Sequence, residues 1–238
     1  AGRCRADKKG MTLHAIRRLI AGPVTLVLLG GLASAAAAQA LTTLYGARPP
    51  AGSSYVRVVD PSTQPVTVAI GAAPATRLSA AGMIATTYRI EPGGRPVAIA
   101  IDGQSLTTSV VLPAGAFLTL IVRRGSDGPR LAAIADTVGD VDGLRAQLRF
   151  YNLAAGCRAS VQTASGATVF AGIASGESIA RTINPVTATL VPHCGATAGR
   201  SLRLPQLNAG DRYSIFLIGD AARPTLVGNL DLTEPYKK

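Results

Sequence analysis

Tryptophan is absent from the 238-residue sequence, and six tyrosines and four phenylalanines are its only other aromatic residues. Sugar-binding β-proteins usually stack Trp or Tyr side chains on sugar rings, so this composition disfavours an aromatic binding platform. After residue 40 the sequence also lacks a tract rich in lysine or arginine. Together the two absences make nucleic-acid binding a poor interpretation. Contact with a glycan through arginine and tyrosine stays open.

Histidine is almost as rare, because only His193 follows the first 40 residues. A Ser-His-Asp triad or a Cys-His pair would have to use it. Its neighbour Cys194 would point to the opposite face of a strand, and no G-x-S-x-G pattern is present. The sequence has no C-x-x-C, and no second histidine or cysteine completes a zinc site. We predict no catalytic residue, no cofactor and no metal.

Paired carboxylates of the kind used in glycoside hydrolysis are not excluded, since any two acidic residues could converge in the fold. Most of the acids, however, lie in turn contexts such as Asp127 before Gly128 and Asp142 before Gly143. Aspartate is an ordinary turn former at such places. No D-x-D-x-D-G spacing indicates a calcium loop.

The first 40 residues have the layout of a secretory signal peptide. Met11 precedes two arginines at 17–18, an apolar run over 19–32 and a small-residue tail that ends at Ala40. The run is shorter than the roughly 20 apolar residues that a spanning helix needs. We therefore predict export to the periplasm with cleavage before Leu41, and we set residues 1–10 aside as an upstream extension.

Removal of residues 1–40 changes the charge balance. That segment holds six of the 24 basic residues and one of the 13 acidic residues, which leaves 18 and 12 and a net charge of +6. A mild positive excess favours contact with an anionic polysaccharide or an acidic protein face. A basic surface that serves only solubility is an equal alternative.

Export also gives the cysteines a meaning. Two remain after residue 40, Cys157 and Cys194. An isolated pair in an oxidising compartment is typically bonded. By strand parity Cys157 shares a face with Val161, and Cys194 shares a face with Leu190, so both point towards the core. We predict a Cys157–Cys194 disulfide.

The sequence contains an internal repeat. Four segments of the first half recur in order in the second half at an offset of about 91 to 95 positions. The clearest pair is Ile90-Glu91-Pro92 and Ile183-Asn184-Pro185, 93 positions apart. Chance similarity among strands rich in alanine and valine would not give four ordered matches, so each half is one copy of the same domain.

Within each copy the apolar residues alternate, as at Val66, Val68 and Ile70. Alternation between turn signals indicates half-buried antiparallel strands, and about seven fit in a copy. We predict an all-β protein of two tandem small antiparallel β-sandwich domains that arise from the duplication and follow the signal peptide. The predicted boundaries are 1–40 for the extension and signal, 41–135 for the first domain, 136–145 for the linker and 146–238 for the second domain.

Three segments resemble a known family. Leu44-Tyr45-Gly46, followed by the stretch 49–58, resembles the opening of mature proteins of the alginate O-acetylation AlgF family. The segments 148–153 and 181–186 resemble its V-R-V-x-N-L and R-x-I-N-P-V strands. The cysteine pair and the stretch 193–204 have no counterpart in that pattern.

The resemblance implies a non-catalytic periplasmic adaptor for O-acetylation of an exopolysaccharide, alginate or a related polymer such as cellulose. It implies two partners, a membrane-bound O-acyltransferase and a periplasmic SGNH-type acetyltransferase. A glycan-binding β-sandwich module and a chaperone-like envelope protein with an exposed edge strand are the alternatives.

An adaptor needs a contact surface. Tyr55 and Arg57 in the first copy, and Arg149 and Tyr151 in the second, alternate with core residues and should project from the opposite face. Tyrosine and arginine often anchor interfaces, so we predict these four as the interaction surface. The alternative is that this face packs inside the protein.

Overall fold

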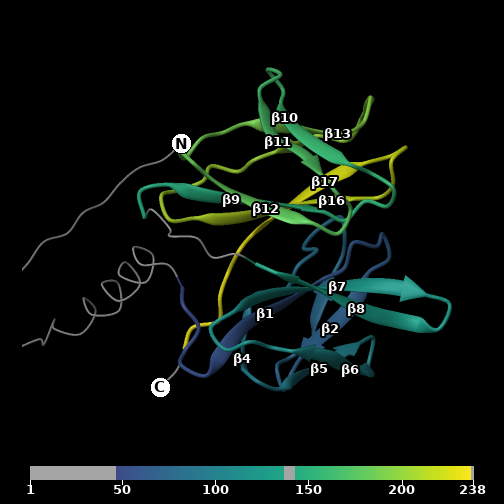
Figure 1. The fold of residues 1–238 in the computed structure, drawn as a ribbon, viewed down its shortest axis with the longest axis vertical. Coiled ribbons are helices and arrows are strands. Elements are labelled where there is room, and N and C mark those ends of the chain that lie inside the picture. The colour runs from purple at the N-terminus through teal and green to yellow at the C-terminus, as the bar shows by residue number, and fades with distance from the viewer. Residues whose placement is uncertain (1–46, 137–142, 237–238) are drawn as a thin grey trace, which may run out of the picture.

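The computed structural model describes residues 47–136 and 143–236 (Figure 1). Within this part of the chain there are 17 strands and no helix, and hence no helix long and apolar enough to cross a membrane. The predicted signal peptide, its cleavage site and most of the predicted linker lie outside the described residues. The predicted all-β class is confirmed.

The first half forms two four-stranded sheets, with strand orders β4-β1-β7-β8 and β3-β2-β5-β6. Their strands are β1 (Ser53–Val59), β2 (Val66–Ile70), β3 (Thr76–Leu78), β4 (Arg89–Pro92), β5 (Pro96–Ile101), β6 (Gln104–Val111), β7 (Phe117–Gly125) and β8 (Gly128–Ala135).

The second half repeats this arrangement with the orders β12-β9-β16-β17 and β11-β10-β13-β14, where β15 also pairs with β13. Its strands are β9 (Ala146–Asn152), β10 (Ala159–Thr163), β11 (Thr168–Ile173), β12 (Ser178–Ile183), β13 (Thr189–Cys194), β14 (Thr197–Ala198), β15 (Leu202–Arg203), β16 (Arg212–Ile218) and β17 (Thr225–Leu230).

The matching strand orders agree with the duplication seen in the sequence. The sheets are not purely antiparallel, however, because β1 runs parallel to β7 and β9 runs parallel to β16. In each copy the chain leaves the sheet after its first strand, returns once to add an edge strand (β4 or β12), completes the other sheet and then returns for the last two strands. Such a long connection is what a parallel pair requires.

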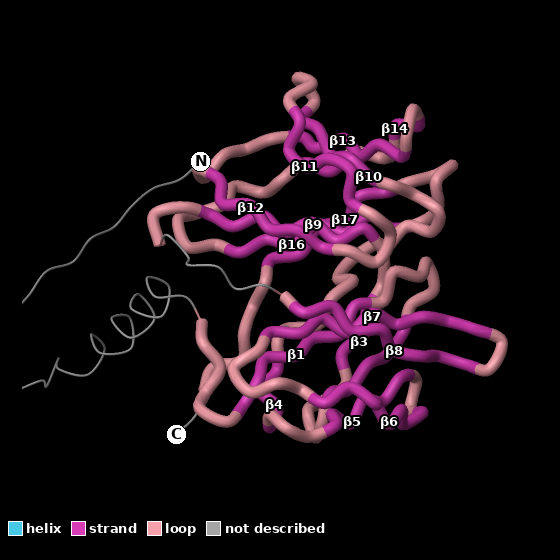
Figure 2. The backbone as a smooth tube through the Cα atoms, viewed as in Figure 1, coloured by secondary structure: helices cyan, strands magenta, loops and turns pink. Residues whose placement is uncertain are grey.

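The four sheets stack as four layers along the long axis of the molecule (Figure 1, Figure 2). The β4-β1-β7-β8 and β12-β9-β16-β17 sheets are the two middle layers and face each other. Each domain has its own apolar core between its two sheets, built from residues such as Val56, Val58 and Leu120 in the first and Leu148, Phe150 and Ile215 in the second. The stack is a pair of β-sandwiches joined face to face.

The predicted disulfide is present. Cys157 and Cys194 are bonded, with 5.3 Å between their Cα atoms, and both side chains belong to the core of the second domain. Cys194 lies directly opposite Ala159 across the β10–β13 pair, which brings the residue two positions before Ala159 within reach. The parity argument from the sequence therefore holds.

The two copies differ beyond β13. In the first domain β6 pairs along β5 as one continuous strand. In the second domain the equivalent stretch is split into β14 and β15, which pair with opposite ends of β13. Between β14 and β15 the chain moves away from β13, and Arg200 forms a parallel bridge with Thr225 of β17.

The end of the chain crosses from the second domain back to the first (Figure 1). After β17, Thr233 forms a parallel bridge with Tyr88, and the amide of Tyr88 donates to the carbonyl of Leu232 over 2.8 Å. The carboxylate of Glu234 accepts from Arg89 at 2.9 Å. Residues beyond β17 thus pack against the first domain, although the sequence assigned them to the second. The predicted domain boundaries themselves stay a prediction.

Candidate functional site

The middle layers meet through an apolar cluster to which both domains contribute. Val59, Ile84 and Ile121 come from the first domain, and Tyr151 and Phe216 from the second. All five are buried, and the rings of Tyr151 and Phe216 stack with 4.9 Å between centroids. Because this apolar cluster is buried between the domains, the side chains on the outer faces of β1 and β9 are not exposed to solvent.

Arg57 lies at the centre of this interface and is fully buried, with 0% of its surface exposed. Its guanidinium donates to four side chains. Three belong to the second domain: the Tyr151 hydroxyl at 2.7 Å, the Ser214 hydroxyl at 2.8 Å and the Asp231 carboxylate at 2.6 Å. The fourth, Thr119 of β7, accepts from Nε at 2.9 Å. One arginine of the first domain thereby binds β9, β16 and the residue that follows β17 in the second.

Asp136 forms the other half of this network. Its carboxylate accepts hydrogen bonds from the hydroxyls of Tyr88 at 2.8 Å, Thr119 at 2.6 Å and Tyr151 at 2.6 Å. Tyr151 therefore accepts from Arg57 and donates to Asp136. We call Arg57, Tyr88, Thr119, Asp136, Tyr151, Ser214 and Asp231 the interdomain polar cluster.

The arginine is also enclosed by aromatic rings. Its guanidinium carbon lies 4.4 Å from the ring centroid of Tyr88 and 5.3 Å from that of Tyr151. Cation–π attraction of this kind strengthens when the groups are removed from water. The cluster thus combines an ion pair, hydrogen bonds and ring contacts, which is the arrangement a buried charge needs.

Burial by itself lowers the pKa of the Arg57 guanidinium, but Asp231 and the neighbouring tyrosines outweigh it and raise that pKa well above its usual value. Burial raises the pKa of Asp231, against the opposing effects of Arg57 and Ser214. Burial likewise raises the pKa of both Tyr88 and Tyr151 well above the ordinary tyrosine range. The tyrosines are therefore neutral donors at physiological pH.

The structure corrects the predicted interaction surface. Arg57 and Tyr151 are 0% exposed, and Tyr55 and Arg149 are each 4% exposed. The parity argument was right, because Val56 and Val58 do face the core of their own domain. The assumption that the opposite face meets solvent was wrong, because the other domain covers it.

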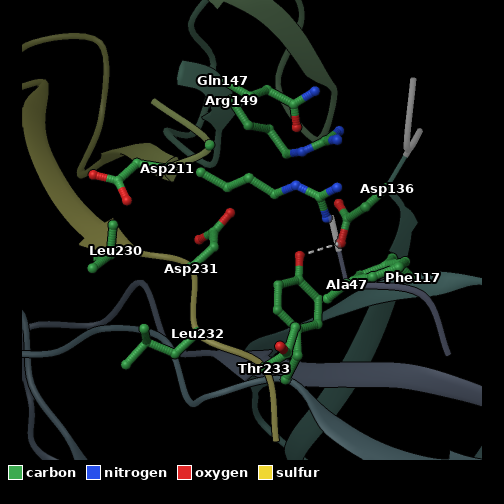
Figure 3. Close-up of a pocket in the computed structure, with 13 residues that line it drawn as sticks. Ala47, Phe117, Asp136, Gln147, Arg149, Asp211, Leu230, Asp231, Leu232 and Thr233 are labelled. Carbon is green, nitrogen blue, oxygen red and sulfur yellow. Dashed lines mark hydrogen bonds between the residues drawn. The ribbon is translucent and has the colours of Figure 1, made fainter. Parts of the chain in front are cut away.

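A cavity of about 270 Å³ opens beside the interdomain polar cluster (Figure 3). Its walls include Asp136, Arg149, Arg212 and Asp231, and Figure 3 shows Arg149 extending into it from the side of the second domain. Burial lowers the pKa of Arg212, which Asp231 opposes. Tyr55 lies outside the lining, where its ring packs 4.9 Å from Phe117.

The chemistry available in this cavity is limited. Its carboxylates are engaged, since Asp136 and Asp231 accept from the cluster and Asp211 accepts from the amide of Asn208. None of the described residues that line it is a serine, cysteine or histidine. Among the described residues no group of three or more His, Cys, Asp and Glu side chains could hold a metal ion. In this arrangement the charged and hydroxyl groups at the interface bind one another.

His193 lies away from these groups. It sits in β13 opposite Ser160, and its side chain has no hydrogen bond within the described part of the chain. Its neighbour Cys194 is bonded to Cys157, so it carries no thiol. The Cys-His pair that the sequence put in question therefore does not form.

The model of one protein family, described as alginate O-acetyl transferase AlgF, matches residues 26–212. The chain belongs to the AlgF family. This membership confirms the resemblance and links the protein to alginate O-acetylation. The AlgF match covers Arg57 and Tyr151 but ends before Ser214, Asp231 and the segment that returns to the first domain.

No curated protein sequence matches this AlgF-family chain. Two solved structures show a faint likeness, each with a TM-score of 0.25. One is a family 26 carbohydrate-binding module of Eubacterium rectale Amy13K, 11% identical, covering 76% of this chain and 98% of that one. The other is a putative cell adhesion protein from Bacteroides ovatus, 8% identical, covering 81% and 100%. At this TM-score neither bears on the AlgF protein's fold or function.

Sequence reasoning missed five members of the cluster: Tyr88, Thr119, Asp136, Ser214 and Asp231. Asp136 was assigned to the linker because it opens an acidic, glycine-containing stretch. One signal was present: Arg57 occupies a strand position between two apolar residues, and a lone arginine there demands buried partners when both faces are covered. Nothing in the sequence names those partners, because they lie 62 to 174 positions away.

Proposed function

We propose that this protein is a non-catalytic periplasmic adaptor of alginate O-acetylation, acting by contact with the acetyltransferase machinery. Its partners would be the periplasmic SGNH-type acetyltransferase and the membrane-bound O-acyltransferase. The match to the AlgF family supports the link to alginate O-acetylation. The adaptor role is our inference from the chemistry and rigidity of the two domains.

The scarcity of reactive groups supports a role without catalysis. His193 is the only histidine after residue 40, and both cysteines after that point are bonded to each other. Acyl transfer by a serine or cysteine normally needs a nearby base to activate the nucleophile. The carboxylates at the interface are occupied by hydrogen bonds within the molecule.

The interdomain polar cluster supports a bridging role. A buried arginine that donates to three groups of the other domain holds the two sandwiches in one relative orientation. Domains joined by small polar contacts usually move against each other, whereas this junction adds an apolar cluster. A rigid two-domain body can hold two partners at a fixed separation.

Gene deletion combined with complementation tests the pathway. Loss of the gene should abolish acetylation of the polymer while polymer synthesis continues, and the wild-type gene should restore acetylation. A His193→Ala variant should restore it equally well, because the proposal gives that imidazole no chemistry. Failure of His193→Ala, in a protein that is folded and secreted normally, would speak for catalysis.

Co-purification tests the adaptor role itself. Tagged protein from the periplasm should retain the SGNH-type acetyltransferase, and purified protein alone should transfer no acetyl group from an activated ester to alginate. Acetyl transfer by the purified protein would overturn the proposal, and so would normal acetylation without any complex.

A further inference from the structure

A second hollow, a groove of about 980 Å³, lies on the seam between the domains and shares no lining residue with the cavity beside Arg57. One wall comes from the first domain, at Pro61, Thr63 and residues 80–82. The other wall comes from the β14–β15 segment and from β17 with the turn before it. The groove exists only because the two domains are held together.

The groove has an apolar floor and a basic rim. Leu226 and Ile218 are buried apolar residues of its lining. Arg200, Arg203 and Arg223 are exposed side chains of the same lining. Three cations and two largely buried apolar side chains therefore line the same groove.

In the part of the chain that the structure describes, these arginines have no partner for their charge. Within the described residues none of their guanidinium groups makes a side-chain hydrogen bond or an ion pair, unlike Arg57, Arg89, Arg124 and Arg130. The one acid in the lining, Asp220, already accepts from the backbone amides of residues 222 and 223. With three arginines against one aspartate, the described lining of the groove has a net positive charge.

The basic wall is held in place. Arg200 bridges to Thr225, its amide donates to the carbonyl of Pro224, and its carbonyl accepts from Leu226. Gly199 allows this approach, because a Cβ there would overlap the Pro224 carbonyl. This wall is the β14–β15 segment, in which the second domain differs from the first. A preorganised site loses less entropy when it binds.

We propose that this groove binds a stretch of an anionic polysaccharide, a chain of uronic acids, with the three arginines pairing with its carboxylates. A polyuronate carries one carboxylate on each sugar, and guanidinium is the side chain best suited to planar carboxylates. The apolar floor suits the carbon-bearing faces of sugar rings. Alginate, the polymer in the family's description, has this chemistry.

This inference goes beyond the adaptor role and requires only the link to alginate. It supplies the glycan contact that the lack of tryptophan disfavoured, because charge replaces the aromatic platform. An acidic protein face would meet the same arginines, but it would not need the narrow seam between two domains. Binding of an acidic partner instead of the glycan is thus a separate outcome of the test.

Calorimetric titration of the folded, secreted protein with unacetylated mannuronate oligosaccharides tests the site. The oligosaccharides should bind, neutral mannan oligosaccharides of equal length should not, and added salt should weaken binding. The triple variant Arg200→Ser, Arg203→Ser, Arg223→Ser should weaken affinity by about tenfold or more, since charged hydrogen bonds are lost.

A matched control removes the same charge elsewhere. Arg48, Arg77 and Arg95 are exposed in the first domain and also make no side-chain hydrogen bond or ion pair within the described residues, so their triple serine variant should bind within about twofold of wild type. Gly199→Val should weaken binding without any change of charge. Equal weakening by both triple variants would mean general charge attraction and would overturn the site.

The two proposals fail separately. If the wild type binds no oligosaccharide yet still retains the acetyltransferase, the groove proposal is wrong and the adaptor role stands. If the groove variant loses the acetyltransferase but not the oligosaccharide, the arginines face a protein partner, which also overturns the groove proposal. Glycan binding without any acetyltransferase complex would support the groove proposal and overturn the adaptor role.

Discussion

The Nη2 atom of Arg57 lies 2.7 Å from the hydroxyl of Tyr151, 94 positions further along the chain. Each residue belongs to the strand that opens its copy of the repeat, β1 and β9. Each alternates along its strand with residues that face its own domain's core. The two copies therefore meet through the sheet faces that point away from those cores. The contact turns two sandwiches into one body.

Arg57→Ala should destabilise the protein by about 3–5 kcal/mol, because it leaves Asp231 buried without its cation and removes a donor from Ser214 and Tyr151. Denaturant unfolding followed by circular dichroism measures this. Arg77→Ala is the control, since Arg77 is exposed and unpaired within the described residues, and it should stay within about 0.5 kcal/mol of wild type. An equally small effect at Arg57 would contradict the interface.

Tyr151→Phe should cost less, on the order of 1 kcal/mol, since it removes one hydroxyl and keeps the ring. Nη2 of Arg57 keeps Ser214, and Asp136 keeps the hydroxyls of Tyr88 and Thr119. The same unfolding assay ranks the two variants. Tyr236→Phe, at an exposed site, should be neutral. A Tyr151→Phe variant as unstable as Arg57→Ala would show that the hydroxyl, rather than the ion pair, dominates.

Loss of the disulfide should destabilise the second domain. The bond closes a loop of 37 residues, for which the chain-entropy estimate is about 4 kcal/mol. The double variant Cys157→Ala, Cys194→Ala should unfold at correspondingly lower denaturant. Thiol titration of the unreduced wild-type protein should find neither cysteine free. Reaction of both with a thiol reagent before reduction would disprove the bond.

Alkaline pH should unfold the protein through its tyrosines. Burial raises the pKa of Tyr88 and Tyr151 in the folded state, so above about pH 10 the unfolded chain has lost protons that the folded chain keeps. Stability should therefore be unaffected by these groups below that pH and fall as pH rises beyond it. Absorbance of tyrosinate near 295 nm is a clean probe, because the sequence has no tryptophan.

In that titration the buried tyrosines should ionise only together with unfolding, in one cooperative step. Tyr151→Phe should reduce the amplitude of this step by one tyrosine. Smooth ionisation of all tyrosines in a protein that stays folded would mean that the interface is open to water.

The sequence by itself determined the class of fold, the repeat, the disulfide and the faces of the first strands. Each rests on local information: period-two alternation assigns Val56 and Leu148 to cores, and parity turns Cys157 and Cys194 inward. The family resemblance also needed only short segments in order. Such features survive because strand geometry relates neighbouring residues in a fixed way.

Only the tertiary structure decided what covers the remaining faces. Whether Arg57 meets water or Asp231 depends on contacts 174 residues apart, and no local pattern encodes which of two sheet surfaces pairs with another. The parallel pairing of β1 with β7 and the return of Thr233 to Tyr88 were hidden for the same reason. The groove at the seam needs both domains and one altered copy of the repeat, so it arises only when the two sandwiches have packed.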